Sequence, residues 1–246
     1  MNAIIVQARV GSRRLKEKTL LPLSGKPLIF RIIERLKKVK NVKKIILAIP
    51  DTKKDNKIVK VFKNEDIIIF RGSENNLVER HYLAAKKYNV RNIIRFPGDN
   101  CIPEPKEIDR IIKYYESFKK PFFATNLSNV FNNGYPDGIG AEIFGFNFLD
   151  DLINKNLTKF QLEHPHINFL NYSKNEIINN KWCTVRTIRC PKRIRRPEIR
   201  LDVNTSKDYS YIKKIYDSLY FKNHNFDISS VIKFIDRSNK KIKKMN

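Results

Sequence analysis

A basic loop close to the N-terminus holds the first residues whose types could do chemistry. It reads Gln7-Ala8-Arg9-Val10-Gly11-Ser12-Arg13-Arg14-Leu15-Lys16-Glu17-Lys18. The loop follows an apolar run and precedes a segment with helical spacing, where backbone N–H groups and fixed cations can surround a polyphosphate. Gly11 permits close backbone approach, and Ser12 adds a hydroxyl donor. Arg9, Arg14 and Lys18 could neutralise a triphosphate. On this chemistry alone, a phosphate site and an ordinary basic surface loop are equally good interpretations.

A second candidate is the aspartate of Pro97-Gly98-Asp99, which directly follows an apolar run. A carboxylate at the end of a strand can hold Mg²⁺ against phosphate oxygens. An isolated aspartate in such a position is more often a helix cap or a turn former. The Gly98-Asp99 context favours metal binding, so we predict that Asp99 is a Mg²⁺ ligand.

The histidines and cysteines point to no further chemistry. His164 and His166 flank Pro165, which indicates a loop and disfavours a zinc site. Cys101, Cys183 and Cys190 are odd in number and form no CxxC pair. They are typical of reduced structural thiols, and we expect a cytoplasmic protein.

These residues need elements that bring them together, and the first half of the chain alternates strands and helices. The pattern predicts strands at 3–6, 44–49, 66–70 and 92–96, and helices at 27–39 and 77–88. Apolar Ile/Val strands between amphipathic helices indicate an α/β fold with a doubly wound, mostly parallel sheet. In such sheets ligands bind at the carboxyl ends of the strands.

The pattern becomes less regular after Pro121. We expect strands at 122–126 and 141–144 around a loop at 132–140, a helix at 147–155, a late strand at 200–203 and a helix at 206–219. Residues 121–197 would form a smaller, β-rich extension for acceptor binding or dimerisation. Residues 1–220 would then form one domain, and 221–246 a basic C-terminal helix or tail whose run at 240–244 is frayed.

Composition limits the classes of protein. The chain has 246 residues, 41% of them hydrophobic, and its formal net charge is +25. The lysines are spread along the whole chain, which favours a solvated basic surface over a nucleic-acid footprint. No apolar run approaches the roughly 20 residues that span a bilayer, so we expect no membrane insertion. A nucleic-acid-binding module is supported only by the charge, and we expect no nucleic acid as a partner.

Several segments match one set of motifs in the same order. The first loop keeps six positions of the signature A-R-x-G-S-x-R-L-P-G-K, with Lys16-Glu17 in place of Pro-Gly, and Leu23 to Ile29 match L-x-G-K-P-L/M-I. Residues 95–102 match R-x-x-G-D-x-P-L-I, with Cys101 in place of proline. Residues 136–144 match P-D-G-x-x-x-E-V-F, and residues 200–208 match L-x-V-D-T-x-x-D with the aspartate displaced. The chain thus resembles the acylneuraminate and 3-deoxy-manno-octulosonate cytidylyltransferases, most of all the branch associated with spore-coat polysaccharide synthesis.

The resemblance implies a nucleotide-diphospho-sugar transferase-like (Rossmann-like) fold over residues 1–219. It also implies a Mg²⁺-dependent nucleotidyltransferase that moves CMP from CTP to an anionic sugar or hydroxy acid and releases pyrophosphate, and a homodimer. By the same resemblance the catalytic residues are Arg14, Lys18 and Asp99, and the metal ligands are Asp99 and Asp202. The nucleotide contacts are Gln7, Ala8, Arg9, Gly11, Ser12, Arg71, Arg80 and Gly98, and the acceptor contacts are Asp137, Glu142, Glu163 and His164. The alternative is a glycosyltransferase that uses a nucleotide-sugar on the same fold, although the cationic first loop suits a triphosphate better.

Overall fold

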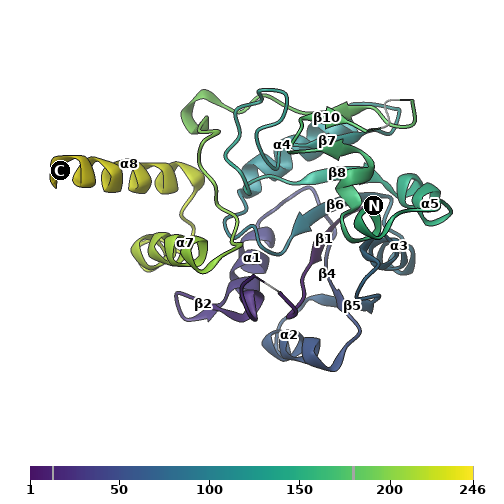
Figure 1. Ribbon diagram of the computed structural model, residues 1–246, viewed down its shortest axis with the longest axis horizontal. Coiled ribbons are helices and arrows are strands. Elements are labelled where there is room, and N and C mark those ends of the chain that lie inside the picture. The colour runs from purple at the N-terminus through teal and green to yellow at the C-terminus, as the bar shows by residue number, and fades with distance from the viewer. Residues whose placement is uncertain (13, 179–180, 246) are drawn as a thin grey trace.

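The centre of the molecule is a seven-stranded sheet, seen nearly edge-on in Figure 1. A computed structural model describes residues 1–12, 14–178 and 181–245. The strand order is β11-β7-β8-β6-β1-β4-β5. The bounds are β1 Asn2–Gln7, β4 Lys44–Pro50, β5 Ile68–Gly72, β6 Asn92–Pro97, β7 Phe123–Thr125, β8 Glu142–Gly145 and β11 Val185–Arg186. Strands β6, β1, β4 and β5 are mutually parallel, and β11 is parallel to β7. Among the strands of the described residues, only β8 runs antiparallel to both of its neighbours. The predicted doubly wound, mostly parallel fold is confirmed.

Both faces of this sheet are covered by helices, because alternate residues of each strand point to opposite sides. In β1, Ile4 and Val6 belong to one buried cluster and Ala3 and Ile5 to the other. The first cluster takes residues from α1 (Leu28–Leu36), α2 (Asn56–Val61), α4 (Pro105–Glu116) and α7 (Ser206–Leu219). The second takes residues from α3 (Leu77–Lys87) and α5 (Phe146–Ile153).

The prediction of a late strand at 200–203 is wrong. This segment forms only two isolated bridges, Asn100 with Asp202 and Asp137 with Arg200. Its backbone bonds to loop residues instead of joining the sheet as a strand: the Leu201 N–H donates to the Asp137 carbonyl at 3.1 Å, and the Val203 N–H donates to the Asp99 carbonyl at 2.9 Å. Leu201 and Val203 are buried, so the apolar alternation reflects burial without a ladder.

The region 121–197 contains little regular structure apart from β7, β8 and α5. It also holds α6 (Lys159–Glu163), the small pair β9 (Leu170–Asn171) and β10 (Glu176–Ile177), and the edge strand β11. Residues 179 and 180 of this predicted extension lie outside the described residues. Another two-stranded pair, β2 (Pro22–Leu23) with β3 (Lys26–Pro27), precedes α1.

The C-terminal segment is helical: α8 covers Ile228–Met245 and projects from the body in Figure 1. Ile228, Val231, Ile232 and Ile235 are buried in the same cluster as α1 and α4, so the first half of α8 is part of the core. Asn246 of the predicted basic tail lies outside the described residues. Among the described residues, no helix is both long and apolar enough to cross a bilayer.

Candidate active site

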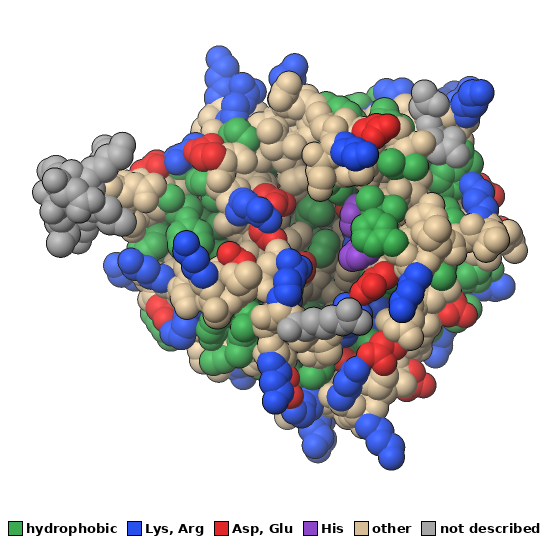
Figure 2. Space-filling view, viewed as in Figure 1, with side chains coloured by type: hydrophobic (Ala, Val, Ile, Leu, Met, Phe, Trp, Pro, Cys, Tyr) green, Lys and Arg blue, Asp and Glu red, His purple; other side chains and the backbone are tan. Residues whose placement is uncertain are grey.

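A cavity of about 650 Å³ opens at the carboxyl ends of β1 and β6, where the fold class places ligands. Figure 2 shows it as a hollow with histidine side chains on its wall, whereas Lys and Arg are scattered over this face of the molecule. Most of the predicted site residues lie together in its lining. These are Gln7, Ala8, Arg9, Ser12, Arg14, Lys18, Arg80, Gly98, Asp99, Asp137, Glu142, Glu163, His164 and Asp202.

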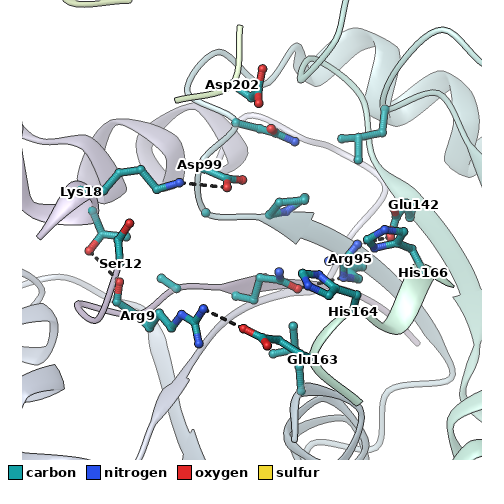
Figure 3. Close-up of a pocket in the computed structure, with 18 of the residues that line it drawn as sticks. Arg9, Ser12, Lys18, Arg95, Asp99, Glu142, Glu163, His164, His166 and Asp202 are labelled. Atoms are coloured by element: carbon teal, nitrogen blue, oxygen red, sulfur yellow. Dashed lines mark hydrogen bonds and ion pairs between the residues drawn. The ribbon is translucent and has the colours of Figure 1, made fainter. Parts of the chain in front are cut away.

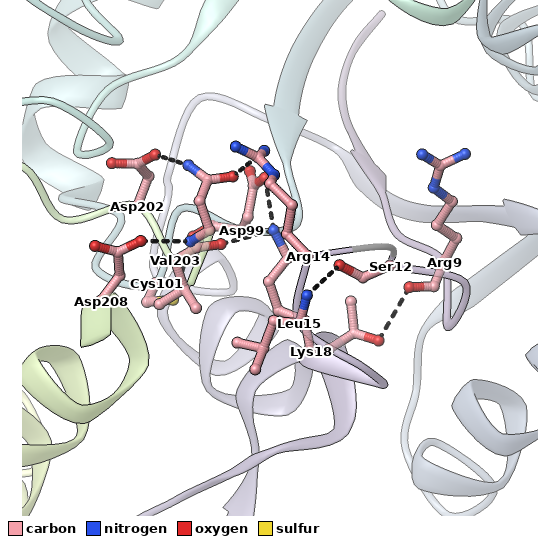
Figure 4. Close-up of polar contacts among 12 residues, drawn as sticks. Arg9, Ser12, Arg14, Leu15, Lys18, Asp99, Cys101, Asp202, Val203 and Asp208 are labelled. Atoms are coloured by element: carbon pink, nitrogen blue, oxygen red, sulfur yellow. Dashed lines mark hydrogen bonds and ion pairs between the residues drawn. The ribbon is translucent and has the colours of Figure 1, made fainter. Parts of the chain in front are cut away.

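Three cations of the first loop, Arg9, Arg14 and Lys18, line the pocket, and each of the three has a partner from a distant segment (Figures 3 and 4). Lys18 is buried, and its Nζ donates to Asp99 Oδ2 at 3.0 Å and to the Val203 carbonyl at 2.6 Å. Arg9 Nη2 lies 2.9 Å from Glu163 Oε1. Arg14 Nη2 donates to Asn204 Oδ1 at 2.5 Å. The loop therefore presents its positive charge to one cavity.

The completely buried side chain of Asp55 fixes the path of this loop. Its Oδ1 accepts from the Val10 N–H at 2.7 Å, and its Oδ2 accepts from the Thr52 hydroxyl at 2.5 Å. Glu17 stands where the related signature has glycine, and it adopts a left-handed conformation with φ of 50°. The departure from that signature thus keeps the turn, although a residue with a Cβ is strained there.

Three aspartates lie on the other side of Lys18. The Val203 N–H donates to the Asp99 carbonyl at 2.9 Å, and the two bridges bring Asp202 beside Asn100 and Asp137 beside Arg200. Burial raises the pKa of Asp137 to about 6, and the negative charges of Asp202 and Asp99 add to this effect. Carboxylates that repel one another in this way gain from a bound cation.

A magnesium ion suits this arrangement. Among the described residues, no three His, Cys, Asp or Glu side chains are grouped closely enough to hold a metal by themselves. Mg²⁺ commonly takes only one or two carboxylates and completes its shell with phosphate oxygens and water. The acidic oxygens of Asp99 and Asp202 are the hard donors it prefers, so the residues present fit the ion.

Gly98 brings β6 and the end of β1 into close contact. Its N–H donates to the Gln7 carbonyl at 2.9 Å, and a Cβ on Gly98 would lie 2.4 Å from that same oxygen. Only glycine fits here without a backbone shift. Gly98 therefore fixes the path of the turn that follows β6, and with it the position of the adjacent Asp99.

Arg80 is a buried cation on the pocket wall. It is 4% exposed, and its Nε and Nη1 have no hydrogen-bond partner within the described part of the chain. Burial, together with the nearby charge of Arg9, lowers the pKa of Arg80 to about 10, so it remains charged at neutral pH. Buried donors without acceptors are costly, and they mark a place where a ligand can supply acceptors.

One end of the pocket is a polar network that sequence reasoning largely missed. Arg95 forms a buried ion pair with Glu142, and its Nε donates to Gln7 Oε1 at 2.9 Å. The Tyr172 hydroxyl donates to Glu142 Oε1 at 2.8 Å. His166 also lines this end, and burial lowers its pKa to about 4. A charged residue inside the apolar strand Ile93–Phe96 was the available signal for Arg95, whereas nothing local distinguished Tyr172.

Two predicted nucleotide contacts lie outside the pocket lining. All three guanidinium nitrogens of Arg71 are engaged by the segment that follows β4. They donate to Asp51 Oδ1 at 2.8 Å, Asn56 Oδ1 at 2.7 Å and the Thr52 carbonyl at 2.8 Å. A Cβ on Gly11 would meet Lys54 Nζ at 3.1 Å, so Gly11 lies against that side chain.

The fold and this pocket together define an α/β protein of the nucleotidyltransferase type. At one edge of its parallel sheet, a cationic loop with Arg9, Arg14 and Lys18 lies beside an acidic centre formed by Asp99, Asp137 and Asp202. The sequence matches the cytidylyltransferase family over residues 3–231, and the chain belongs to that family.

Similar proteins agree with this assignment. The uncharacterized protein MJ1063 of Methanocaldococcus jannaschii is 34% identical over 98% of this chain and 93% of its own. The spore coat polysaccharide biosynthesis protein SpsF of Bacillus subtilis is 28% identical over 86% of this chain and 85% of its own. Among solved structures, a cytidylyltransferase from Leptospira borgpetersenii superposes with a TM-score of 0.84 and 25% identity. This superposition covers 97% of this chain and 95% of that one.

Proposed function

We propose that this protein transfers CMP from CTP to an acidic, sugar-like acceptor and releases pyrophosphate. The observation that carries the proposal is the contact between the cationic loop and the acidic centre. Lys18 Nζ lies 3.0 Å from Asp99 Oδ2 at the carboxyl edge of the sheet. Positive charges for a triphosphate thus stand beside carboxylates for a metal ion, as in-line transfer of a nucleotidyl group requires.

The proposed step is the attack of an acceptor oxygen on the α-phosphorus of CTP. The acceptor hydroxyl gives its proton to water as its oxygen forms the new bond to phosphorus. The bond from the α-phosphorus to the oxygen that bridges to the β-phosphate breaks, and pyrophosphate leaves with the bonding pair. Arg9, Arg14 and Lys18 neutralise the phosphates and hold them in line. Their partners Glu163, Asn204 and Asp99 come from other segments, so several parts of the chain hold these cations at the pocket.

Magnesium would be held by Asp99 and Asp202, and when bound it supplies positive charge that stabilises the leaving pyrophosphate. The bridge between Asn100 and Asp202 keeps both carboxylates at the same edge of the sheet. Lys18 contacts Asp99 and the Val203 carbonyl, so it spans the two segments that carry these ligands.

The acceptor and the biological setting are inferred from relatives. SpsF is named for spore coat polysaccharide biosynthesis, and 3-deoxy-manno-octulosonate cytidylyltransferases match part of this chain. These names support an acidic sugar as the acceptor and cell-surface polysaccharide synthesis as the setting. The residues available to the acceptor are Asp137, Glu142, Glu163, His164, His166 and Tyr172.

Thermal stabilisation by nucleotides tests the first half of this proposal. A ligand at 100 times its dissociation constant adds roughly 2.7 kcal/mol to the free energy of unfolding. We expect CTP with Mg²⁺ to raise the melting temperature, and pyrophosphate to appear when a suitable acidic sugar is added. Stabilisation by a nucleotide-sugar without any pyrophosphate release would instead support the glycosyltransferase alternative.

A further inference from the structure

Two charged groups of the candidate site are joined by a neutral side chain, that of Asn204. Arg14 Nη2 donates to Asn204 Oδ1 at 2.5 Å, and Asn204 Nδ2 donates to Asp202 Oδ2. Figure 4 shows Arg14 and Asp202 at the two ends of this chain of bonds. Both charged residues line the cavity, whereas Asn204 does not. Asn204 can therefore act on a ligand in the cavity only through these two neighbours.

The two bonds require a side chain that accepts on one side and donates on the other. A guanidinium has donors and no acceptor, and an ionised carboxylate has acceptors and no donor. The carbonyl oxygen of an asparagine side chain suits Arg14, and its NH₂ group suits Asp202. An apolar side chain at position 204 would make neither bond.

The backbone around Asn204 is held by contacts that are independent of the two charged groups. On one side, the Val203 N–H donates to the Asp99 carbonyl at 2.9 Å. On the other side, Asp208 Oδ2 accepts from the Asn204 N–H at 3.0 Å and from the Thr205 N–H at 2.8 Å, as part of the cap of α7. The fold therefore fixes the place from which the Asn204 side chain reaches both partners.

The carboxylate of Asp202 keeps one oxygen for a cation. Its side-chain contacts within the described residues are the bond from Asn204 and an ion pair with Arg200 at 3.4 Å, and both involve Oδ2. Asp99 is divided in the same way, since Lys18 contacts its Oδ2. In the described part of the chain, Oδ1 of each proposed metal ligand has no hydrogen bond.

A direct ion pair between Arg14 and Asp202 would work against the proposed chemistry. Arg14 is the group for the triphosphate, and Asp202 is the group for the metal ion. A guanidinium that pairs with a carboxylate forms strong, charge-assisted bonds. Such a pair would compete with phosphate oxygens for Arg14 and with the metal ion for Asp202.

We propose that Asn204 is a positioning residue that holds Arg14 and Asp202 apart by bonding to both. The guanidinium then stays available to the triphosphate and the carboxylate to the metal ion. This inference rests on the proposed function, because that function gives the two charged groups their ligands. It adds to the site a residue outside the cavity lining.

The test measures the affinity of the full-length protein for inorganic triphosphate, with metal ions chelated, by titration calorimetry at low ionic strength. Asn204→Ala should lower this affinity about fivefold or more, because Arg14 would then pair with Asp202. Adding Asp202→Asn to Asn204→Ala should restore it. This gain should exceed the gain from Asp202→Asn in the wild type by about fivefold or more. A merely structural role of Asn204 would make the two gains equal.

Asn225→Ala is the matched control. Asn225 Oδ1 also accepts from a cation, Lys38 Nζ at 2.5 Å, but it lies outside the cavity lining. This variant should keep the wild-type affinity for triphosphate and the wild-type turnover of CTP with Mg²⁺. Asn204→Ala should turn over CTP about tenfold or more slowly, as expected when a residue that orients a metal ligand is lost.

The outcomes separate this inference from the proposed function. Equal gains from Asp202→Asn in the two backgrounds, in a protein that releases pyrophosphate from CTP, overturn the role of Asn204 and leave the proposed function standing. Unequal gains in a protein that never releases pyrophosphate support the role of Asn204 and overturn the proposed function. A wild type that binds neither inorganic triphosphate nor CTP overturns both.

Discussion

Asp99 is the residue on which the proposed chemistry depends most. It joins the cationic loop through Lys18 and stands beside the segment that carries Asp202. Asp99→Asn should lower turnover by at least about 10²-fold, because it removes a metal charge without changing volume. The melting temperature should change little, since the Asp99 side chain is one-third exposed. Pyrophosphate release measures the first effect and thermal unfolding the second.

Asp217→Asn is a suitable comparison, because Asp217 pairs with Lys213 on the exposed surface of α7. Its turnover should equal that of the wild type. Wild-type turnover in Asp99→Asn itself would rule out the proposed role of that carboxylate.

Residue types and motif order predicted much of this site, and the exceptions have physical reasons. Arg71 was expected at the nucleotide, yet its three nitrogens find acceptors beside β5. A motif places a residue on a strand but does not say which contacts compete for its side chain. Tyr172 was missed for the opposite reason, since its partner Glu142 lies 30 positions away and only the folded chain brings them together.

At the scale of elements, the close approach of β6 to β1 depends on Gly98. Gly98→Ala should destabilise the protein by about 1–3 kcal/mol, because its Cβ would press on the Gln7 carbonyl at 2.4 Å. Turnover should also fall, since the shift would displace Asp99. Chemical denaturation and steady-state kinetics measure these effects.

Gly11→Ala is the matched substitution, because the new methyl group would meet only the ends of long side chains, Lys54 Nζ at 3.1 Å and Glu74 Oε1 at 3.8 Å. We expect its stability to stay within about 0.5 kcal/mol of the wild type. Equal stabilities of the two variants would contradict the proposed role of the strand contact.

A buried histidine of helix α3 makes the stability of the protein depend on pH. His81 is fully buried there, its Nδ1 is 2.8 Å from the Leu77 carbonyl, and burial lowers its pKa from 6.5 to about 3. Between these values the unfolded chain binds a proton that the folded chain does not, so stability falls as the pH falls. Denaturation midpoints at pH 7 and pH 5 should therefore differ more in the wild type than in His81→Gln.

His224 provides the comparison for this measurement, because it is exposed and stacks on Tyr220. His224→Gln should keep the wild-type loss of stability on acidification. An undiminished loss in His81→Gln would show that His81 is not its source.

Elements in the first half of the chain were predictable because each strand is short, apolar and followed by a polar turn. The strand prediction failed for segment 200–203, because Leu201 and Val203 are buried by tertiary contacts although the segment does not pair with a strand of the sheet. Helix α4 was not foreseen, although Pro105 stands at its first turn, a favoured place for proline.

At the scale of the whole molecule, we propose a homodimer formed through residues 121–197. Phe160 and Ile178 of this region are large apolar side chains that are 59% and 44% exposed, so contact with a second chain there would bury apolar surface. Light scattering should give twice the chain mass for the wild type and a reduced mass for Phe160→Asp with Ile178→Asp. Phe221→Asp, at a residue 69% exposed outside this region, should not change the mass. A monomeric wild type would exclude the dimer.

The contact of Lys18 with the Val203 carbonyl joins positions 185 residues apart. A chain emerging from the ribosome can therefore form β1, β4 and β6 long before Val203, one of the two partners of Lys18, has been synthesised. Until then the acidic centre lacks Asp202, and the loop cations face a half-built cavity. Under the proposed function, activity would appear only after the segment that carries Asp202 and Val203 has packed against the first loop. The time at which activity appears during synthesis would therefore measure when the final third of the chain docks.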